Sequence, residues 1–206
     1  MTEHYYSKNP TSKSNPSQFQ TSILSSTFTF HTDEGVFSKK QLDYGTNVLL
    51  HAFELPEVEG DLLDLGCGYG PIGIGLAKQY RDREILMVDI NERAVELSKK
   101  NCEVNAVENA RVLQSDGIES VSNQRFATVI TNPPFRAGKT VVHQMVEDSY
   151  ELLLEGGELW VVVQKKQGAP SLKGKIKNVF GQVDVVKRDK GYFILRGKKF
   201  DSDIPV

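Results

Sequence analysis

The sequence predicts an α/β domain in which helices cover both faces of a mostly parallel sheet that finishes in an antiparallel hairpin. Three observations predict this class. The chain has 206 residues, 39% of them hydrophobic, which is enough for one domain with a substantial core. From Asp61 onward, short apolar runs alternate with helix-length segments, and parallel strands need crossover connections of that kind. Near the end, two strand-like runs are joined through Lys190-Gly191, which is too short for a crossover helix, so those strands must be antiparallel.

We expect three parts along the chain. Residues 1–18 are rich in Ser, Asn, Pro and Lys and should form a flexible polar arm. Residues 19–56 should form a hairpin and a helix that pack on the core. Residues 57–200 should form the core itself.

The second part contains two expected elements. Residues 27–31 alternate in the manner of a strand, 33–35 supply a turn, and 36–38 begin the return strand. A helix is expected over residues 42–54, because its apolar positions have helical spacing and a proline follows.

The core should alternate strands and helices. The expected strands cover residues 62–65, 85–88, 112–113, 127–130 and 159–163. The expected helices cover residues 72–80, 92–104, a short segment near Ile118, and 141–154. The closing hairpin should pair residues 183–187 with residues 192–195.

Composition argues against several classes of protein. Cys67 and Cys102 are the only cysteines and are far apart, which argues against a disulfide framework or a zinc knuckle and favours the cytoplasm. The four histidines have no metal-ligand spacing and there is no nucleophile-elbow serine, so we expect neither a metal site nor hydrolase chemistry. The sequence shows no signal-type or membrane-spanning apolar run, so no membrane partner is expected. We expect a monomer or a small homo-oligomer.

Positive charge is concentrated near the end of the chain. The net charge is −2, yet residues 161–200 contain eleven basic side chains and two acidic ones. A basic face of this kind suits a phosphate backbone, because neutralised phosphates release counterions. A solvated lysine-rich surface explains the same charges equally well.

A glycine-rich segment follows the first core strand. Gly66, Gly68 and Gly70 at alternate positions let the backbone pass close to a bound molecule and turn into a helix, whose first amides favour a polar ligand group. Asp89 ends the next strand, where an acid can accept both hydroxyls of a ribose. The segment therefore predicts a nucleotide-type cofactor.

Two cofactors fit this segment. Gly68-x-Gly70-x-x-Gly73 with Asp89 matches the dinucleotide fingerprint of dehydrogenases. In the other register, Asp64 stands just before the glycines and can act on a cationic amino-acid group, which methionine supplies and nicotinamide does not. Since the chain is also too short for a separate substrate domain, we favour S-adenosylmethionine.

Asp116 and Gly117 follow the third core strand. The acid could accept a hydrogen bond from an adenine amino group, with Gly117 permitting close approach. Alternatively, Asp116 caps the short helix near Ile118. We favour the binding role.

The tetrapeptide Asn132-Pro133-Pro134-Phe135 follows the fourth core strand. The prolines fix the backbone and donate no hydrogen bonds, so the turn presents acceptors only. The Asn132 side-chain oxygen and the Pro133 carbonyl can both accept from one planar NH₂ group. Such acceptors localise the nitrogen lone pair and align it for in-line methyl transfer, while Phe135 offers a surface on which a base can stack. An ordinary strand-ending turn is the structural alternative.

These residues together resemble the class I S-adenosylmethionine-dependent methyltransferases. More narrowly, they resemble the small-domain group that includes the small-subunit (16S) ribosomal RNA guanine-N2 methyltransferases. The resemblance covers about residues 20–199 and rests on DLGCGYGPIG, VDIN, NPPFRAGK, and GVFS with LDYG downstream. It implies a Rossmann-like seven-stranded sheet, S-adenosyl-L-methionine as cofactor, and ribosomal RNA or a small-subunit particle as partner.

The resemblance also assigns residues to roles. Those expected to bind the cofactor are Phe37, Ser38, Asp64, Gly66, Cys67, Gly68, Gly70, Asp89, Ile90, Asn91, Asp116, Gly117 and Asn132. Those expected to act in catalysis are Asn132, Pro133, Pro134 and Phe135. Those expected to bind the substrate are Phe135, Arg136 and Lys139.

Guanine N2 of small-subunit ribosomal RNA is the leading target, and other functions stay open. Glutamine methylation of a release factor and adenine-N6 methylation of DNA use the same chemistry, although the sequence shows no domain that recognises either substrate. A noncatalytic RNA-binding or ribosome assembly factor could also keep the cofactor pocket, but Asp89 and Asn132 are both intact.

Overall fold

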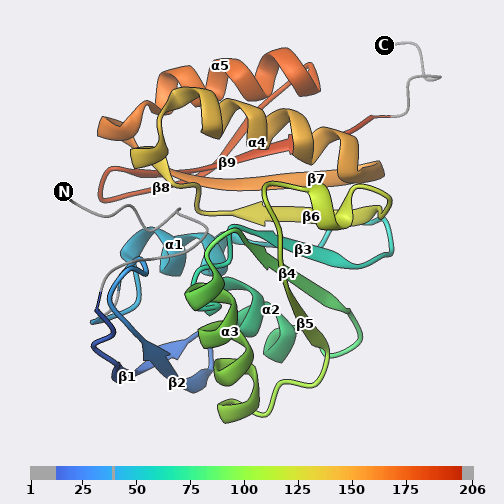
Figure 1. Cartoon of the computed structure of the whole chain (residues 1–206). Coiled ribbons are helices and arrows are strands. Elements are labelled where there is room, and N and C mark those ends of the chain that lie inside the picture. Colours follow the sequence, from blue (N-terminus) through green and yellow to red (C-terminus); the bar gives the residue numbers. More distant parts are fainter. Residues whose placement is uncertain (1–12, 39, 201–206) are drawn as a thin grey trace.

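The computed structural model describes residues 13–38 and 40–200 and confirms the expected sheet (Figure 1). Seven strands form one sheet in the order β5-β4-β3-β6-β7-β9-β8. The strands are β3 (Leu62–Leu65), β4 (Ile85–Asp89), β5 (Ala110–Gln114), β6 (Phe126–Thr131), β7 (Leu153–Gln164), β8 (Asp184–Asp189) and β9 (Tyr192–Lys198). The first five are parallel to one another, and β9 runs antiparallel to both β7 and β8.

Helices cover both faces of this sheet, as predicted. One face carries α1 (Tyr44–Ala52), α2 (Pro71–Gln79) and α3 (Glu92–Val104), and the other carries α4 (Lys139–Leu152) and α5 (Ala169–Phe180) (Figure 1). The two layers bury two separate hydrophobic cores. Trp160 belongs to the first core and its neighbour Val161 to the second, because successive strand residues face opposite sides. Strands buried on both faces explain the continuous apolar runs of the sequence.

The N-terminal hairpin differs from the predicted one. The strand expected at 27–31 is β2 (Ser26–Thr32), but it pairs with β1 (Ser17–Ile23), which precedes it, and residues 36–38 form no strand. The connecting turn contains no glycine, and Leu24 adopts a φ of +53° there. The first strand therefore begins within the expected arm, whose residues 1–12 lie outside the described part of the chain.

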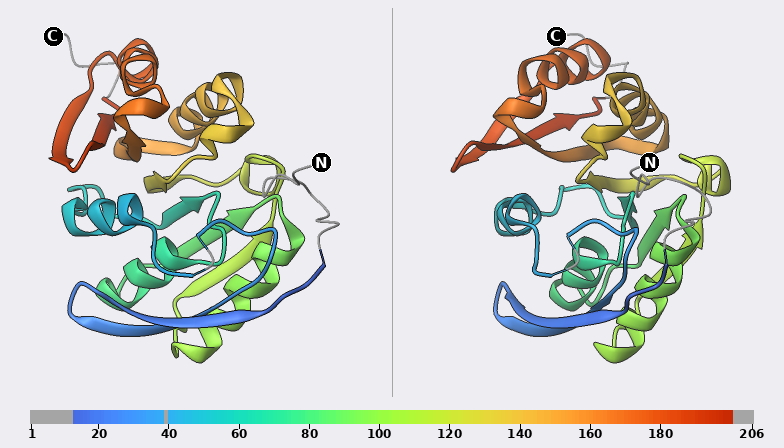
Figure 2. Two further views of the ribbon diagram at one scale, coloured as in Figure 1. Left: turned by 90° about the vertical axis from the view of Figure 1, so that its left-hand side faces the viewer. Right: turned by 60° about the vertical axis from the view of Figure 1, so that its left-hand side comes forward.

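The N-terminal hairpin lies beside α3 (Figure 2), and two asparagines attach it there. The Asn101 side chain accepts from the His31 amide at 2.7 Å and donates to the His31 carbonyl at 2.9 Å. Asn105 makes the same pair of contacts with Thr29, at 3.0 Å and 2.8 Å. Each asparagine thus replaces a missing strand neighbour along β2 and holds the hairpin over the α3 layer.

Three further differences concern helices. The sequence prediction omitted α5, although Leu172, Ile176 and Phe180 are buried at helical spacing. The short helix near Ile118 is a 3₁₀ turn at Glu119–Val121. The helix expected over 42–54 is shorter, because the Asp43 side chain caps it and the backbone becomes extended at Phe53. In the described residues, no helix is long and apolar enough to span a bilayer.

Candidate functional site

The glycine-rich loop connects β3 to α2 in a conformation that requires glycine. Gly66, Gly68 and Gly70 have φ values of +79°, +58° and +98°. At Gly70 a Cβ atom would lie 2.9 Å from the side-chain ends of Ile74 and Met87, so any other residue would have to displace them in addition to adopting the positive φ. The backbone at Gly68 has open space beside it, where a ligand can approach.

Asp89 is the last residue of β4, the strand next to β3 in the sheet. Its carboxylate accepts from the Gly68 amide at 2.8 Å and from the Asn91 amide at 2.9 Å. Burial raises the pKa of the Asp89 carboxyl. Asn91 does not face the cavity: it caps α3 by accepting from the Ala94 amide and donates to the Gly35 carbonyl at 3.0 Å. It therefore ties the loop after β2 to the cofactor side.

Asp64 lies beneath the glycine loop and not on the cavity wall. Its Oδ2 accepts from the Gly73 amide at 2.8 Å, whereas its Oδ1 is buried with no hydrogen-bond partner in the described residues. Burial, together with the nearby negative charge of Asp89, raises the pKa of the Asp64 carboxyl to about 7. Burial also raises the pKa of the Cys67 thiol well above its usual value, so Cys67 is not a thiolate nucleophile.

The turn after β6 holds Asn132 in one orientation. The Asn132 Nδ2 atom donates to Asp43 Oδ2 and to Thr46 Oγ1, both at 3.0 Å. Both amide protons are thereby used, which leaves Oδ1 as the acceptor. The Pro133 carbonyl already accepts from the Phe135 amide at 2.9 Å, so it can offer a substrate only its second lone pair.

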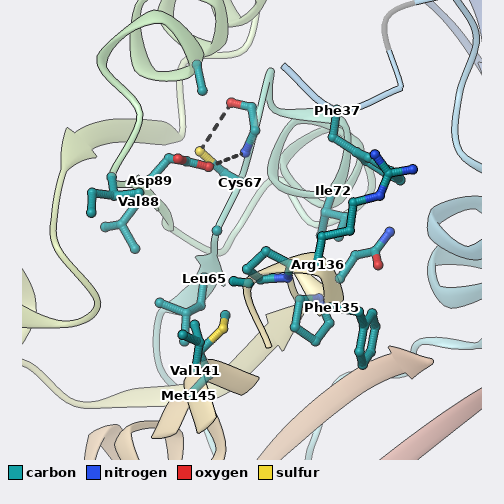
Figure 3. A pocket seen from close by; sticks show the side chains of 18 of the residues that line it. Phe37, Leu65, Cys67, Ile72, Val88, Asp89, Phe135, Arg136, Val141 and Met145 are labelled. Atoms are coloured by element: carbon teal, nitrogen blue, oxygen red, sulfur yellow. Dashed lines mark hydrogen bonds between the residues drawn. The ribbon is translucent and has the colours of Figure 1, made fainter. Parts of the chain in front are cut away.

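These segments enclose a cavity of about 730 Å³ at the carboxyl ends of the parallel strands (Figure 3). Its size lies in the range of small-molecule sites, and ligands of open α/β sheets bind at this edge. Asp89 and Val88 lie on one side of the view and Phe135 and Arg136 on the other (Figure 3). Phe37 is exposed although apolar, and it lines the cavity too.

Most residues predicted for the site line this cavity. They are Phe37, Gly66, Cys67, Gly68, Asp89, Ile90, Asp116, Gly117, Asn132, Pro133, Pro134, Phe135 and Arg136. Five predicted residues are not on its wall: Ser38, Asp64, Gly70, Asn91 and Lys139. Ser38 donates to the Gln41 carbonyl, and Gly70 and Asn91 begin helices. Lys139 is exposed at the start of α4.

Other wall residues were not predicted. α4 contributes a face that includes Gln144, Met145 and Asp148. Within this face, Met145 lies near Gly66 and Asp148 near Gly117.

The Asp116 carboxylate does not cap the 3₁₀ turn, in which Ser115 Oγ instead accepts from the Ser120 amide at 3.1 Å.

Asp43 and Thr46 of the α1 start, and Gln164, Gln167 and Tyr192 of the sheet's other half, complete the wall. They come from segments far from the motifs in sequence.

Six of the eleven basic residues at positions 161–200 lie in two kinds of surroundings. Lys175, Arg196 and Lys199 are engaged within the fold: Lys175 pairs with Glu147, Arg196 with Asp184, and Lys199 donates to two carbonyls.

Lys165, Lys166 and Lys190 are exposed near cavity-lining residues, and we call these three the rim lysines. Of these, Lys190 also places its Nζ atom 4.9 Å from the centroid of the Tyr44 ring. The Lys165 amide donates to the Gly191 carbonyl at 2.8 Å, which joins the segment that carries Lys165 and Lys166 to the segment that carries Lys190. In the described part of the chain, no three His, Cys, Asp or Glu residues gather as a metal site.

Comparisons with known proteins agree with this geometry. The model of the methyltransferase small domain family matches residues 27–196. A Bacillus subtilis protein named "Uncharacterized protein YbxB" is 53% identical over 200 residues, which are 97% of this chain and 100% of that protein. A ribosomal RNA small subunit methyltransferase C from Shewanella amazonensis is 37% identical over 169 residues, 80% of this chain and 48% of that protein.

A solved structure is also similar. It is the T. thermophilus 16S rRNA N2 G1207 methyltransferase (RsmC) in complex with AdoMet and guanosine, with a TM-score of 0.78 and 30% identity. The match covers 89% of this chain and 50% of that one, so this chain spans about half the length of the ribosomal RNA methyltransferases it matches. The fold, the glycine-loop cavity and the family model over residues 27–196 lead to one conclusion: this chain belongs to the methyltransferase small domain family.

Proposed function

We propose that this protein transfers a methyl group to an exocyclic amino nitrogen, namely N2 of a guanine in small-subunit ribosomal RNA. The observation that carries the proposal is the fixed orientation of Asn132, whose amide protons are held by Asp43 and Thr46 at the wall of the cavity. An asparagine held in this way has only its oxygen to offer an incoming NH₂ group.

S-adenosyl-L-methionine is the methyl donor, in keeping with the family, the fold and the AdoMet-bound neighbour. The residues of the cavity fit such a molecule: Gly68 leaves open space beside the loop, and Asp89 can accept from a ribose. Bound there, it would supply an electrophilic methyl group on a positively charged sulfur.

The chain's own groups would then prepare the nucleophile. Asn132 Oδ1 and the second lone pair of the Pro133 carbonyl oxygen accept the two protons of the target NH₂ group. These hydrogen bonds move the lone pair of the target nitrogen out of conjugation with the base. Phe135 presents a flat face on which an unstacked base can rest. No strong base is required, because the proton is lost after the nitrogen has gained its positive charge.

RNA is the proposed substrate class because of the rim lysines and the relatives. Lys165, Lys166 and Lys190 place positive charge next to the cavity mouth, where a phosphate backbone would pass. The relatives named as small subunit methyltransferases match about 80% of this chain. We propose that the protein acts in the cytoplasm, where its two buried cysteines stay free thiols.

A methyl-transfer screen tests the proposal. Purified protein and labelled S-adenosylmethionine are incubated separately with small-subunit particles, naked ribosomal RNA, DNA and a release factor, with Asn132→Ala as the inactive control. We expect label in RNA or particles and in the guanine fraction. Label confined to DNA adenine or to protein would reject the substrate, and transfer to none of the four would favour a noncatalytic RNA-binding role.

A further inference from the structure

Asp43 lies beside Asn132, and one of its two carboxylate oxygens, Oδ1, accepts no hydrogen bond from the described residues. Its Oδ2 accepts from the Thr46 amide at 2.9 Å and from Asn132 Nδ2 at 3.0 Å. The side chain lines the cavity and is only partly buried. Among the described residues, no hydrogen bond reaches Oδ1. A carboxylate oxygen therefore stands next to the group that receives the target nitrogen.

The surroundings hold Asp43 in place. Tyr44, the next residue, donates from its hydroxyl to Asp189 of β8 at 3.0 Å. The Tyr192 ring packs against Gly45 so closely that a Cβ there would lie 2.8 Å from the ring and 3.1 Å from Asp43 Oδ2. The start of α1 is thus fixed to the β8–β9 hairpin, and Asp43 cannot easily move away from Asn132.

We propose that Asp43 selects guanine: its Oδ1 accepts from guanine N1–H while Asn132 and Pro133 accept from N2. This inference rests on the proposed amino-nitrogen methylation. Guanine carries N1–H and the N2 amino group side by side, so its edge donates three protons to a wall that offers only acceptors.

Adenine, cytosine and glutamine cannot donate a hydrogen bond to Asp43 Oδ1 from the position that N1–H has in guanine. Adenine and cytosine carry a ring-nitrogen lone pair next to their amino group, and a glutamine side chain carries a carbonyl oxygen there. Each would place a lone pair against the Asp43 carboxylate. A site that is built to accept a hydrogen bond rejects a ligand lacking the donor, because its own polar group is left unpaired.

Asp43→Asn is the discriminating variant. Asparagine is also a favoured helix cap, and one oxygen can still accept from the Thr46 amide and from Asn132. The other oxygen becomes an NH₂ group, which donates and no longer accepts. The variant therefore keeps the orientation of Asn132 and removes only the proposed contact to N1–H. Thr46→Val is the matched control, since it loosens Asn132 and leaves the Asp43 carboxylate unchanged.

The experiment uses the full chain and the RNA or particle that is labelled in the screen described above. For wild type, Asp43→Asn and Thr46→Val, kcat/KM and the ratio of N2-methylguanosine to N6-methyladenosine are measured, together with S-adenosylmethionine affinity by calorimetry and the melting temperature. We expect Asp43→Asn to lower guanine methylation about 10- to 100-fold. The guanine preference should fall as well, with cofactor affinity and melting unchanged. Thr46→Val should lower kcat without changing the base ratio.

Three results would overturn the inference. Unchanged guanine kinetics in Asp43→Asn would remove the N1–H contact while leaving the proposed function intact. A loss of cofactor affinity in that variant would assign Asp43 to the ammonium group of the cofactor. If the wild type labels no guanine at all, the proposed function fails first, and the inference fails with it.

Discussion

The buried carboxyl of Asp64 should make the stability of the cofactor-free protein depend on pH near neutrality. The side chain is fully buried, accepts one hydrogen bond from the Gly73 amide, and leaves its second oxygen without a partner. Its pKa rises from 3.8 to about 7. Because the folded protein holds this proton more tightly than the unfolded chain, the stabilisation is complete below about pH 4 and is lost as the pH rises through about 7.

The size of the effect follows from the shift. A displacement of about three pH units at about 1.4 kcal/mol per unit corresponds to about 4 kcal/mol as an upper value. That is a large fraction of the roughly 5–15 kcal/mol by which a typical domain is stable. Asp64→Asn removes the titrating group and keeps an oxygen for the Gly73 amide.

Urea unfolding of the cofactor-free protein between pH 4.5 and 8 measures this difference. We expect the wild type to lose stability relative to Asp64→Asn as the pH rises, by up to about 4 kcal/mol. Asp61→Asn, an exposed position just before the same strand, is the control and should follow the wild type. Parallel pH curves for the wild type and Asp64→Asn would refute the reasoning.

Three further predictions concern the site. Asn132→Ala should lower turnover about 100-fold or more and leave S-adenosylmethionine affinity nearly unchanged, because Asn132 acts on the nucleophile; equal turnover would remove it from the mechanism. The double variant Lys165→Glu/Lys166→Glu should weaken RNA binding and reduce its salt dependence, whereas the control Lys99→Glu on α3 should change neither. Filter binding at several salt concentrations measures both properties, and equal binding by the two variants would contradict the prediction. S-adenosylmethionine should bind more tightly at pH 8 than at pH 6, because its positive charge favours the ionised form of Asp64, which then releases its proton. Calorimetry in two buffers of different ionisation enthalpy measures this proton, and binding without proton release would contradict the prediction.

The sequence predicts most of the core because its strands are buried on both faces. The first four residues of β4 and the second half of β7 appear as apolar runs, whereas Asp64 interrupts β3 and Thr128 interrupts β6. β1 was not predicted, because its alternation is weak among serines and glutamines and its turn at Leu24 contains no glycine. The three apolar positions of α5 are separated by lysines and a glycine, so composition concealed their helical spacing.

The candidate site could be predicted only in part. Gly66, Asp89 and Asn132 follow parallel strands, whose carboxyl ends meet at one edge, and they line one cavity. Asp64 faces α2, because side chains alternate along β3, so its carboxylate lies off the cavity wall and its predicted action on the cofactor stays a prediction. Tyr192 reaches the cavity only because β9 inserts between β7 and β8, which is a property of the tertiary fold.

We propose above that Asn132 Oδ1 and the Pro133 carbonyl accept the protons of a guanine amino group, so that this nitrogen receives the methyl group. Mass analysis of nucleosides from small-subunit RNA, after incubation with the protein and S-adenosylmethionine carrying a deuterated methyl group, tests it most directly. We expect deuterated N2-methylguanosine with the wild type and none with Asn132→Ala. A deuterated methyl group only on a ring nitrogen, a ribose oxygen or adenine would contradict it.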